Sequence, residues 1–354
     1  MKKQRIIPFS KAINEALHSS MSNDKNVILY GLGVDDPMEI FGTTEGLAKK
    51  FGNDRVFDVP TSENAITGVG IGASIGGLIP VMTHQRLDFF LLAMDQLVNA
   101  AAKWYFMFGE QRSIPITVRL IIGRGWGQGP THSQNLQSWF AHIPGLKVVM
   151  PSTPEDAKGL LLASIADKNP VVFLEHRWLH NLKGHVEKKA VPIPLGKASV
   201  LRKGKDITLV TMSYATIESI HASDYLKEHF NISCEIIDLR TVSPVDYGTV
   251  FKSISKTGKV LVLDTGMKNC SISSEIIARI AEKFWGKLDK RPEQLALPDF
   301  PEGTSPALTK DYHVSAEDII KRVLFMSDIK SKQKISLERQ FPHDVPGDWF
   351  TGPF

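Results

Sequence analysis

Short runs of apolar and β-branched residues alternate with longer amphipathic stretches along the first half of the chain. We expect the short runs to form buried strands and the longer stretches to form helices, because a strand buried on both faces has a nearly continuous apolar run. The predicted strands are 27–30, 55–59, 79–82, 116–122, 147–150 and 171–174, and the predicted helices are 10–20, 63–75, 93–108 and 154–167. Such alternation predicts a parallel α/β domain.

This pattern stops after residue 175 and resumes later in the chain. Residues 182–206 are rich in Lys, Gly and Pro and contain no long apolar run, which is typical of a linker. A second alternating set follows, with predicted strands at 207–212, 234–239 and 260–264 and predicted helices at 214–228, 246–255 and 273–284. The fold class is therefore α/β with two parallel-sheet domains, at 1–186 and 206–326, joined by a linker at 187–205.

The last segment, 327–354, follows neither pattern. Its final fourteen residues include four aromatic side chains together with several Pro and Gly residues. We predict an extended C-terminal tail that lies along another surface, because exposed aromatic residues gain from burial. A disordered terminus is the alternative interpretation.

Composition and charge restrict the class of protein. The chain has 354 residues, 42% hydrophobic and 23% charged, with a formal net charge of +4 from dispersed basic residues. We expect neither a nucleic-acid nor a membrane partner. The two cysteines lack the spacing of a zinc site. The basic N-terminus has no apolar signal-peptide core, so we expect a cytoplasmic protein.

Two segments are rich in glycine. Gly68, Gly70 and Ala73 fit a loose dinucleotide-binding pattern, but they lie inside a predicted helix rather than at its opening turn. Close helix packing is the favoured interpretation, and a nicotinamide-dependent oxidoreductase is the remote alternative. The loop 123–134 has alternating glycines that would let the backbone approach a ligand, and it contains His132. Two interpretations of this loop remain open: it forms part of a binding site, or it is a mobile surface loop.

Glu63 follows Thr61 and Ser62 at the start of the predicted helix 63–75. A hydroxyl can cap a helix, and an acidic residue suits the positive end of the helix dipole. Local sequence alone therefore favours a structural role for this segment.

Ordered motifs along the chain change that interpretation. They read Asp-Val-Pro-Thr-Ser-Glu at 58–63, Thr-His-Ser-Gln at 131–134, Phe-Ala-His-Ile-Pro-Gly-Leu at 140–146, Pro-Ser-Thr-Pro-Glu-Asp-Ala-Lys at 151–158 and Leu-Arg-Thr-Val-Ser-Pro at 239–244. Together they resemble the beta subunits of thiamine-diphosphate-dependent 2-oxo-acid dehydrogenases over about residues 5–325. The resemblance implies a pyrimidine-binding domain followed by a transketolase-type C-terminal domain.

The resemblance also implies partners. This chain has no Gly-Asp-Gly segment of the kind that holds magnesium and the diphosphate in such enzymes. An alpha subunit would supply both, usually in an α2β2 assembly, and a lipoyl acyltransferase would be a further partner. The implied activity is oxidative decarboxylation of a small 2-oxo acid with acyl transfer to lipoamide.

Site residues follow from their positions in the matching motifs. Glu63 matches the glutamate that hydrogen-bonds a ring nitrogen of the cofactor's aminopyrimidine, and Phe89 matches the aromatic residue that stacks on that ring. His132 matches the histidine implicated in acyl transfer to a lipoyl group. Four positions correspond to a structural potassium site in some relatives, in which the first two contribute backbone carbonyls: Ile116, Ser164, Asp167 and Asn169.

The chain departs from the family pattern at several positions. It has Gly-Leu-Gly-Val at 31–34 where relatives commonly have Gly-Glu-Asp-Val, so two acidic side chains are missing. Arg124 and Trp126 are bulky where relatives favour small residues, and we predict that they line the substrate pocket, since arginine suits a carboxylate or phosphate. Two alternatives follow: a carboligase or transferase acting on a specialised 2-oxo acid outside a large complex, and a non-catalytic scaffolding subunit.

Overall fold

A seven-stranded sheet forms the first domain of the computed structural model, which describes residues 5–36, 38, 40–331, 335, 337 and 344–353. All neighbouring strands are parallel except for the first pair, β12 and β6. In spatial order the strands are β12 (Thr241–Ser243), β6 (Lys147–Val149), β7 (Val171–His176), β5 (Thr117–Ile122), β4 (Ile79–His84), β2 (Val27–Gly31) and β3 (Val56–Asp58).

Helices cover both faces of this sheet, which explains why its central strands are apolar throughout. One face packs on α1 (Phe9–Asn23) and α7 (Pro154–Ile165). The other packs on α3 (Glu63–Ile75), α4 (Leu87–Phe90), the π-helix η2 (Gln96–Ala101), α5 (Ala102–Met107) and α6 (Gln137–Ala141). Helix α7 begins where Thr153 accepts a hydrogen bond from the backbone N–H of Asp156 at 3.2 Å.

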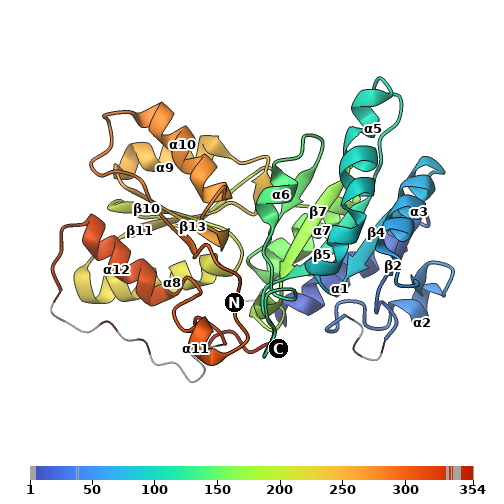
Figure 1. Ribbon diagram of the computed structural model, residues 1–354, viewed down its shortest axis with the longest axis horizontal. Helices are drawn as coiled ribbons and strands as arrows, with labels where there is room; N and C mark the ends of the chain where they lie inside the picture. Colours follow the sequence, from blue (N-terminus) through green and yellow to red (C-terminus); the bar gives the residue numbers. More distant parts are fainter. Residues whose placement is uncertain are drawn as a thin grey trace.

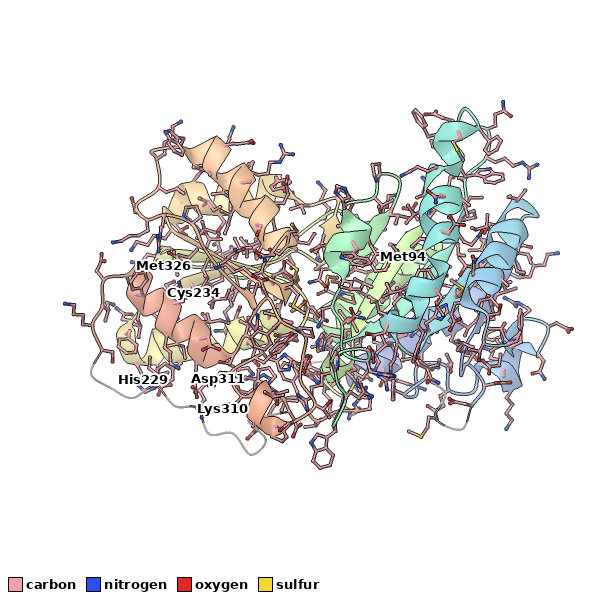
Figure 2. All side chains as sticks on the ribbon, in the orientation of Figure 1. Met94, His229, Cys234, Lys310, Asp311 and Met326 are labelled. Atoms are coloured by element: carbon pink, nitrogen blue, oxygen red, sulfur yellow. The ribbon has the colours of Figure 1, made fainter. Side chains whose placement is uncertain are left out.

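The second domain has three layers (Figure 1). Its five strands are, in spatial order, β14 (Glu293–Leu297), β13 (Val260–Met267), β10 (Ile207–Thr211), β11 (Cys234–Asp238) and β9 (Ser199–Arg202). One face packs on α9 (Tyr247–Thr257) and α10 (Ile272–Phe284), and the other on α8 (Tyr214–Phe230) and α12 (Ala316–Met326). Cys234 and Met326 both belong to this second core (Figure 2).

Several short elements complete the described part of the chain. Strands β1 (Ile6–Pro8) and β8 (Lys183–His185) form a small antiparallel sheet. The remaining short helices are α2 (Leu47–Phe51), η1 (Leu91–Ala93), η3 (Arg177–Leu179) and α11 (Pro306–Thr309). Among the described helices, none combines the length and apolarity needed to cross a membrane.

The two domains share structure at their junction. Strand β12 comes from the second half of the sequence, yet it pairs with β6 at the edge of the first sheet. Arg240 forms an ion pair with Asp156 at 2.8 Å across the same junction. The predicted linker 187–205 also contains β9, which pairs with β11. The segment without regular structure between the domains is therefore shorter than the sequence pattern suggested.

Residues 344–353 of the tail have no helix or strand, and they pack on the junction. The Phe350 ring lies between Trp178 and Tyr214, with ring centroids 5.7 and 6.1 Å away. The Trp349 indole stacks on His221 at 3.6 Å and donates a hydrogen bond to Glu218 at 2.8 Å. This part of the predicted tail is docked. Most of 332–343 lies outside the described residues.

Candidate active site

Three residues predicted from the sequence lie on segments that leave the same edge of the first sheet. Glu63 follows β3, Phe89 lies in α4 after β4, and His132 lies in the loop after β5. These strands are parallel, so their carboxyl ends meet at one edge. The chain also reverses its direction across the sheet here, because β3 and β4 lie on opposite sides of β2. Ligands commonly bind in the crevice at such a reversal.

Glu63 occupies the first turn of α3, and it is buried with 5% of its surface exposed. Ser62, the preceding residue, makes no side-chain capping hydrogen bond. Within the described residues, the Glu63 carboxylate has neither a hydrogen-bond donor nor an ion-pair partner, although its backbone carbonyl accepts a hydrogen bond from Thr67 at 2.8 Å. A buried carboxylate without a donor is costly. The position therefore fits a ligand that donates an N–H, such as an aminopyrimidine ring.

Phe89 and His132 are in direct contact. Their ring centroids are 5.3 Å apart and the rings meet edge to face at 82°. Phe89 remains 42% exposed, which leaves ring surface available for stacking. The Thr131 hydroxyl lies 3.1 Å from His132 Nδ1 and can orient the imidazole. This pair offers an aromatic surface beside an imidazole.

Asp88 and Gln134 hold the two loops of this site together. The Gln134 amide donates to Asp88 Oδ1 at 2.8 Å, so the segment after β5 is tied to helix α4. Burial raises the pKa of Asp88 above its usual range. Gln134 belongs to the motif at 131–134, but its hydrogen bond to Asp88 could not be predicted, because the two residues are 46 positions apart in the chain.

Two carboxylates lie near the segment 31–34, which has Gly-Leu-Gly-Val in place of the expected acidic pattern. Gly33 donates its backbone N–H to Asp58 Oδ1 at 2.7 Å. Gln85 donates to Asp36 Oδ2 at 2.9 Å, and a Cβ atom on Gly33 would lie 1.9 Å from the Gln85 amide nitrogen. The space that a longer residue at position 33 would need is therefore filled by Gln85. Asp36 and Asp58 supply negative charge nearby.

The glycine-rich helix segment supports the packing interpretation at one position. A Cβ atom on Gly70 would lie 2.0 Å from the Tyr30 hydroxyl, so only glycine allows α3 to approach β2 this closely. Gly72 has open space around it. Close packing therefore accounts for Gly70 without a nucleotide.

Arg124 and Trp126 have different environments. Arg124 is buried, and its guanidinium lies 3.5 Å from Glu302 and 3.7 Å from Asp344. It also donates to the backbone carbonyl of Thr304 at 3.2 Å. These contacts connect the loop to the second domain and to the tail, which gives Arg124 a role in holding these parts together. Trp126 is exposed.

The four residues predicted for potassium lie together at the amino edge of the first sheet, away from the candidate active site. The carbonyls of Ile116 and Ser164 each accept a backbone N–H, at 3.0 and 3.2 Å. Asp167 forms an ion pair with Lys147 and accepts the Asn169 N–H at 2.9 Å. A lysine therefore neutralises the one carboxylate of this set. The described residues contain no group of three or more His, Cys, Asp or Glu side chains that could hold a metal ion.

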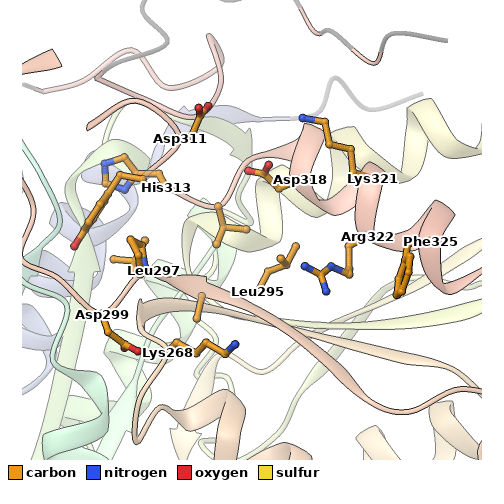
Figure 3. Close-up of a pocket in the computed structure, with 14 residues that line it drawn as sticks. Lys268, Leu295, Leu297, Asp299, Asp311, His313, Asp318, Lys321, Arg322 and Phe325 are labelled. Atoms are coloured by element: carbon orange, nitrogen blue, oxygen red, sulfur yellow. The ribbon is translucent and has the colours of Figure 1, made fainter. Parts of the chain in front are cut away.

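Two cavities lie elsewhere in the described part of the chain. One of 620 Å³ opens in the second domain between β14 and α12, where Leu295 and Arg322 line it (Figure 3). Another of 830 Å³ lies near the domain junction beside Tyr247 and Cys270. Neither contains Glu63, Phe89 or His132.

Comparison with known proteins gives the family. Residues 6–182 match the transketolase pyrimidine binding domain, and residues 196–319 match the transketolase C-terminal domain. The chain is 39% identical to the acetoin:2,6-dichlorophenolindophenol oxidoreductase subunit beta of Cupriavidus necator, over 89% of this chain and 96% of that protein. It is 37% identical to the pyruvate dehydrogenase E1 component subunit beta of Bacillus subtilis, over 89% and 97%.

The chain belongs to the family of 2-oxo acid dehydrogenase E1 beta subunits. The same family includes the 2-oxoisovalerate dehydrogenase subunit beta of Bacillus subtilis, which is 39% identical over 89% of this chain and 96% of that protein. The structure also superimposes on a solved protein described as a split gene transketolase, inactive beta4 tetramer, with a TM-score of 0.75. That match covers 92% of this chain and 100% of the other at 19% identity, and it shows the fold.

Membership of the E1 beta-subunit family confirms the predicted order of a pyrimidine-binding domain and a transketolase-type C-terminal domain. The roles assigned to individual residues rest on their positions and on the geometry given above. Glu63, Phe89 and His132 lie on adjoining segments, and only Glu63 is deeply buried.

Proposed function

We propose that this chain is the beta subunit of a thiamine-diphosphate-dependent 2-oxo acid dehydrogenase, in which Glu63 and Phe89 hold the aminopyrimidine ring of the cofactor. The observation that carries the proposal is the buried Glu63 carboxylate, which has no donor among the described residues, beside the carboxyl edge of a parallel sheet. When bound, thiamine diphosphate supplies a nucleophilic carbon and an electron sink for decarboxylation.

Glu63 accepts an N–H from the ring and exchanges that proton through its carboxylate. The position in the first turn of α3 places the carboxylate at the positive end of the helix dipole. Phe89 presents its exposed ring surface to the planar heterocycle. Because the Phe89 and His132 rings meet edge to face, stacking also fixes the position of the imidazole.

His132 donates and accepts protons during transfer of the acyl group to a lipoyl acceptor. The Thr131 hydroxyl at 3.1 Å holds its Nδ1, which leaves Nε2 for that exchange. A lipoyl acyltransferase is the partner that this role requires, and a small 2-oxo acid is the substrate. Positioned acid–base groups of this kind contribute about 10²–10⁴-fold in rate.

A partner alpha subunit completes the site. Family membership implies such a partner, and we propose that it carries the Gly-Asp-Gly segment and binds magnesium with the diphosphate in an α2β2 assembly. Exposed apolar side chains support a large interface, because Val69, Leu92 and Phe106 are exposed by 67% or more on helices that flank the candidate site. The proposal also includes a structural potassium ion at four residues: Ile116, Ser164, Asp167 and Asn169.

The variant Glu63→Gln tests the proposed role in the assembly formed with the alpha subunit. We expect decarboxylation to fall by about 10²–10⁴-fold while the chain stays folded, because the amide keeps the shape but cannot exchange the proton. Carbon dioxide release and the circular dichroism spectrum are the measurements. Glu282→Gln, an exposed change on α10, is the matched control. Wild-type turnover in Glu63→Gln would refute the assignment.

A further inference from the structure

Two arginines converge on one neutral oxygen beside the candidate active site. Arg86 donates to Gln128 Oε1 at 2.9 Å, and Arg177 donates to the same atom at 3.0 Å. The backbone N–H of Gly125 is a third donor to it, at 2.9 Å. One amide oxygen therefore faces two guanidinium groups, which is an unusual concentration of positive charge around a neutral acceptor.

The other deeply buried arginines of the described chain face carboxylates. Arg119 forms a bidentate ion pair with Glu175, with distances of 2.6 and 3.0 Å, and Arg124 lies beside Glu302. Arg177 is equally buried, yet it donates to two neutral oxygens, those of the Gln128 amide and of the Pro353 carbonyl, each at 3.0 Å. No carboxylate of the described residues lies within ion-pair distance of Arg177 or Arg86.

The surroundings compensate this charge only in part, since the Arg177 guanidinium lies over the Phe41 ring, 5.0 Å from its centre. The pKa of Arg177 is lowered to about 10, first by burial and then by repulsion from Arg86. Asp88 attracts Arg86 from a longer distance, but its carboxylate already accepts the Gln134 amide. Two buried or half-buried cations that share a neutral partner favour an anion as ligand.

Their place in the fold connects them to the reaction. Arg86 lies three residues before Phe89, and Gln128 lies four residues before His132 in the same loop. Arg177 directly follows β7, whose carboxyl end is at the same sheet edge as those of β4 and β5. Arg86 and Gln128 therefore lie on segments that carry the proposed site, and Arg177 follows a neighbouring strand at the same sheet edge.

We propose that Arg86 and Arg177 form a binding site for an oxyanion, a carboxylate or a phosphate, at the far end of the 2-oxo acid substrate. This inference rests on the proposed function for the identity of the substrate. The carboxylate that leaves as carbon dioxide does not suit the site, because two guanidiniums would stabilise it before reaction and oppose its loss. An anion that is retained throughout the reaction gains from the pair without slowing that step.

Gln128 closes the site when no anion is present. Its amide oxygen satisfies the guanidinium donors, and its neighbours Trp126 and Gly127 are exposed, with open space around Gly127. An incoming oxyanion takes over the donors and displaces the Gln128 side chain. Carboxylate and phosphate both match the fork of an arginine guanidinium, so the geometry admits either.

Calorimetric titration of the full-length chain tests the site without any need for turnover. Succinate and inorganic phosphate are the probes, and the tighter one identifies the source of the anion. We expect Arg86→Gln to weaken binding about 10- to 100-fold, the loss of a charged hydrogen-bonding partner. Arg279→Gln, an exposed change on α10, should bind as the wild type does. The proposal is overturned if neither probe binds the wild type, or if Arg86→Gln binds equally well.

Two further readouts distinguish the proposal from a purely structural role. Gln128→Ala should bind the probe at least as tightly as the wild type, because the competing amide is gone; weaker binding would contradict the displacement step. In the assembly with the alpha subunit, Arg86→Gln should raise KM for a dianionic 2-oxo acid while kcat, and KM for pyruvate, change little. An equal rise in KM for pyruvate would overturn the assignment to the far end. Because binding is measured apart from decarboxylation, failure here is separate from failure of the role of Glu63.

Discussion

Phe350→Ala tests whether the C-terminal tail is an integral part of the fold. The Phe350 ring is 3% exposed, and it contacts Trp178 of the first domain and Tyr214 of the second. Removing a buried phenylalanine side chain from a core costs about 3–5 kcal/mol. The tail can partly lift away instead of leaving a cavity, so we expect a loss of about 3 kcal/mol, at the lower end of that range.

Urea unfolding followed by tryptophan fluorescence measures this loss, because Trp178 and Trp349 lie next to the substituted ring. A companion measurement is digestion by carboxypeptidase, which should trim the variant faster than the wild type. Trp285→Ala provides the control, since Trp285 is an aromatic residue that is 84% exposed. Equal unfolding midpoints for Phe350→Ala and Trp285→Ala would refute the docked position of the tail.

Three further predictions follow from the structure. Burial, together with Asp156, raises the pKa of Asp238 to about 8. The folded chain therefore keeps a proton that the unfolded chain releases near pH 4. Because of this difference, the free energy of unfolding falls as pH rises between these two values. Asp238→Asn should remove this dependence and stabilise the chain by about 1–3 kcal/mol at pH 8, and unchanged urea midpoints across that range would contradict it. His132→Ala should slow acylation of a lipoyl domain about 10²–10⁴-fold while carbon dioxide release with an artificial electron acceptor changes less; equal losses would count against a role in acyl transfer. Potassium chloride, compared with choline chloride, should raise stability by up to about 2.7 kcal/mol at a hundredfold excess over Kd, and equal melting temperatures would speak against the four-residue site.

The long elements could be predicted from the sequence because each has its own apolar run or amphipathic stretch. The helix predicted at 63–75 has the same bounds in the structure, and the strand predicted at 171–174 is two residues longer, ending at His176. The edge strands β9 and β14 were missed, because they pair on one side and remain partly exposed. Ser199–Arg202 and Glu293–Leu297 show this half-buried pattern and contain no long apolar run.

Helix α12 was not predicted, although the sequence contains a signal for its start. Ser315 and Asp318 form a reciprocal capping box at the start of α12, and the serine and aspartate spacing is visible in the sequence. Helix α12 lies beyond the last predicted helix, 273–284, and its start is marked by this capping box rather than by a long apolar run.

Some residues of the site could likewise be predicted from the sequence, whereas others are apparent only in the folded structure. Glu63, Phe89 and His132 could be proposed from ordered motifs. The sequence singled out Arg124 for its unusual place in a glycine-rich loop, but it could not show that Glu302, 178 residues away, lies beside it. Arg86 and Arg177 belong to no motif, and their convergence on Gln128 appears only when β4, β5 and β7 are aligned.

The strand β12 limits how this protein can be divided. A cut between the two matched family regions, at residues 183–195, would place Thr241–Ser243 on the fragment that does not contain the first sheet. The first fragment would then present β6 as an open edge, whose unpaired N–H and C=O groups can recruit a strand from another molecule. Fragments intended for separate expression, and fusions that insert a domain at this boundary, should therefore keep residues 241–243 in register with Lys147–Val149.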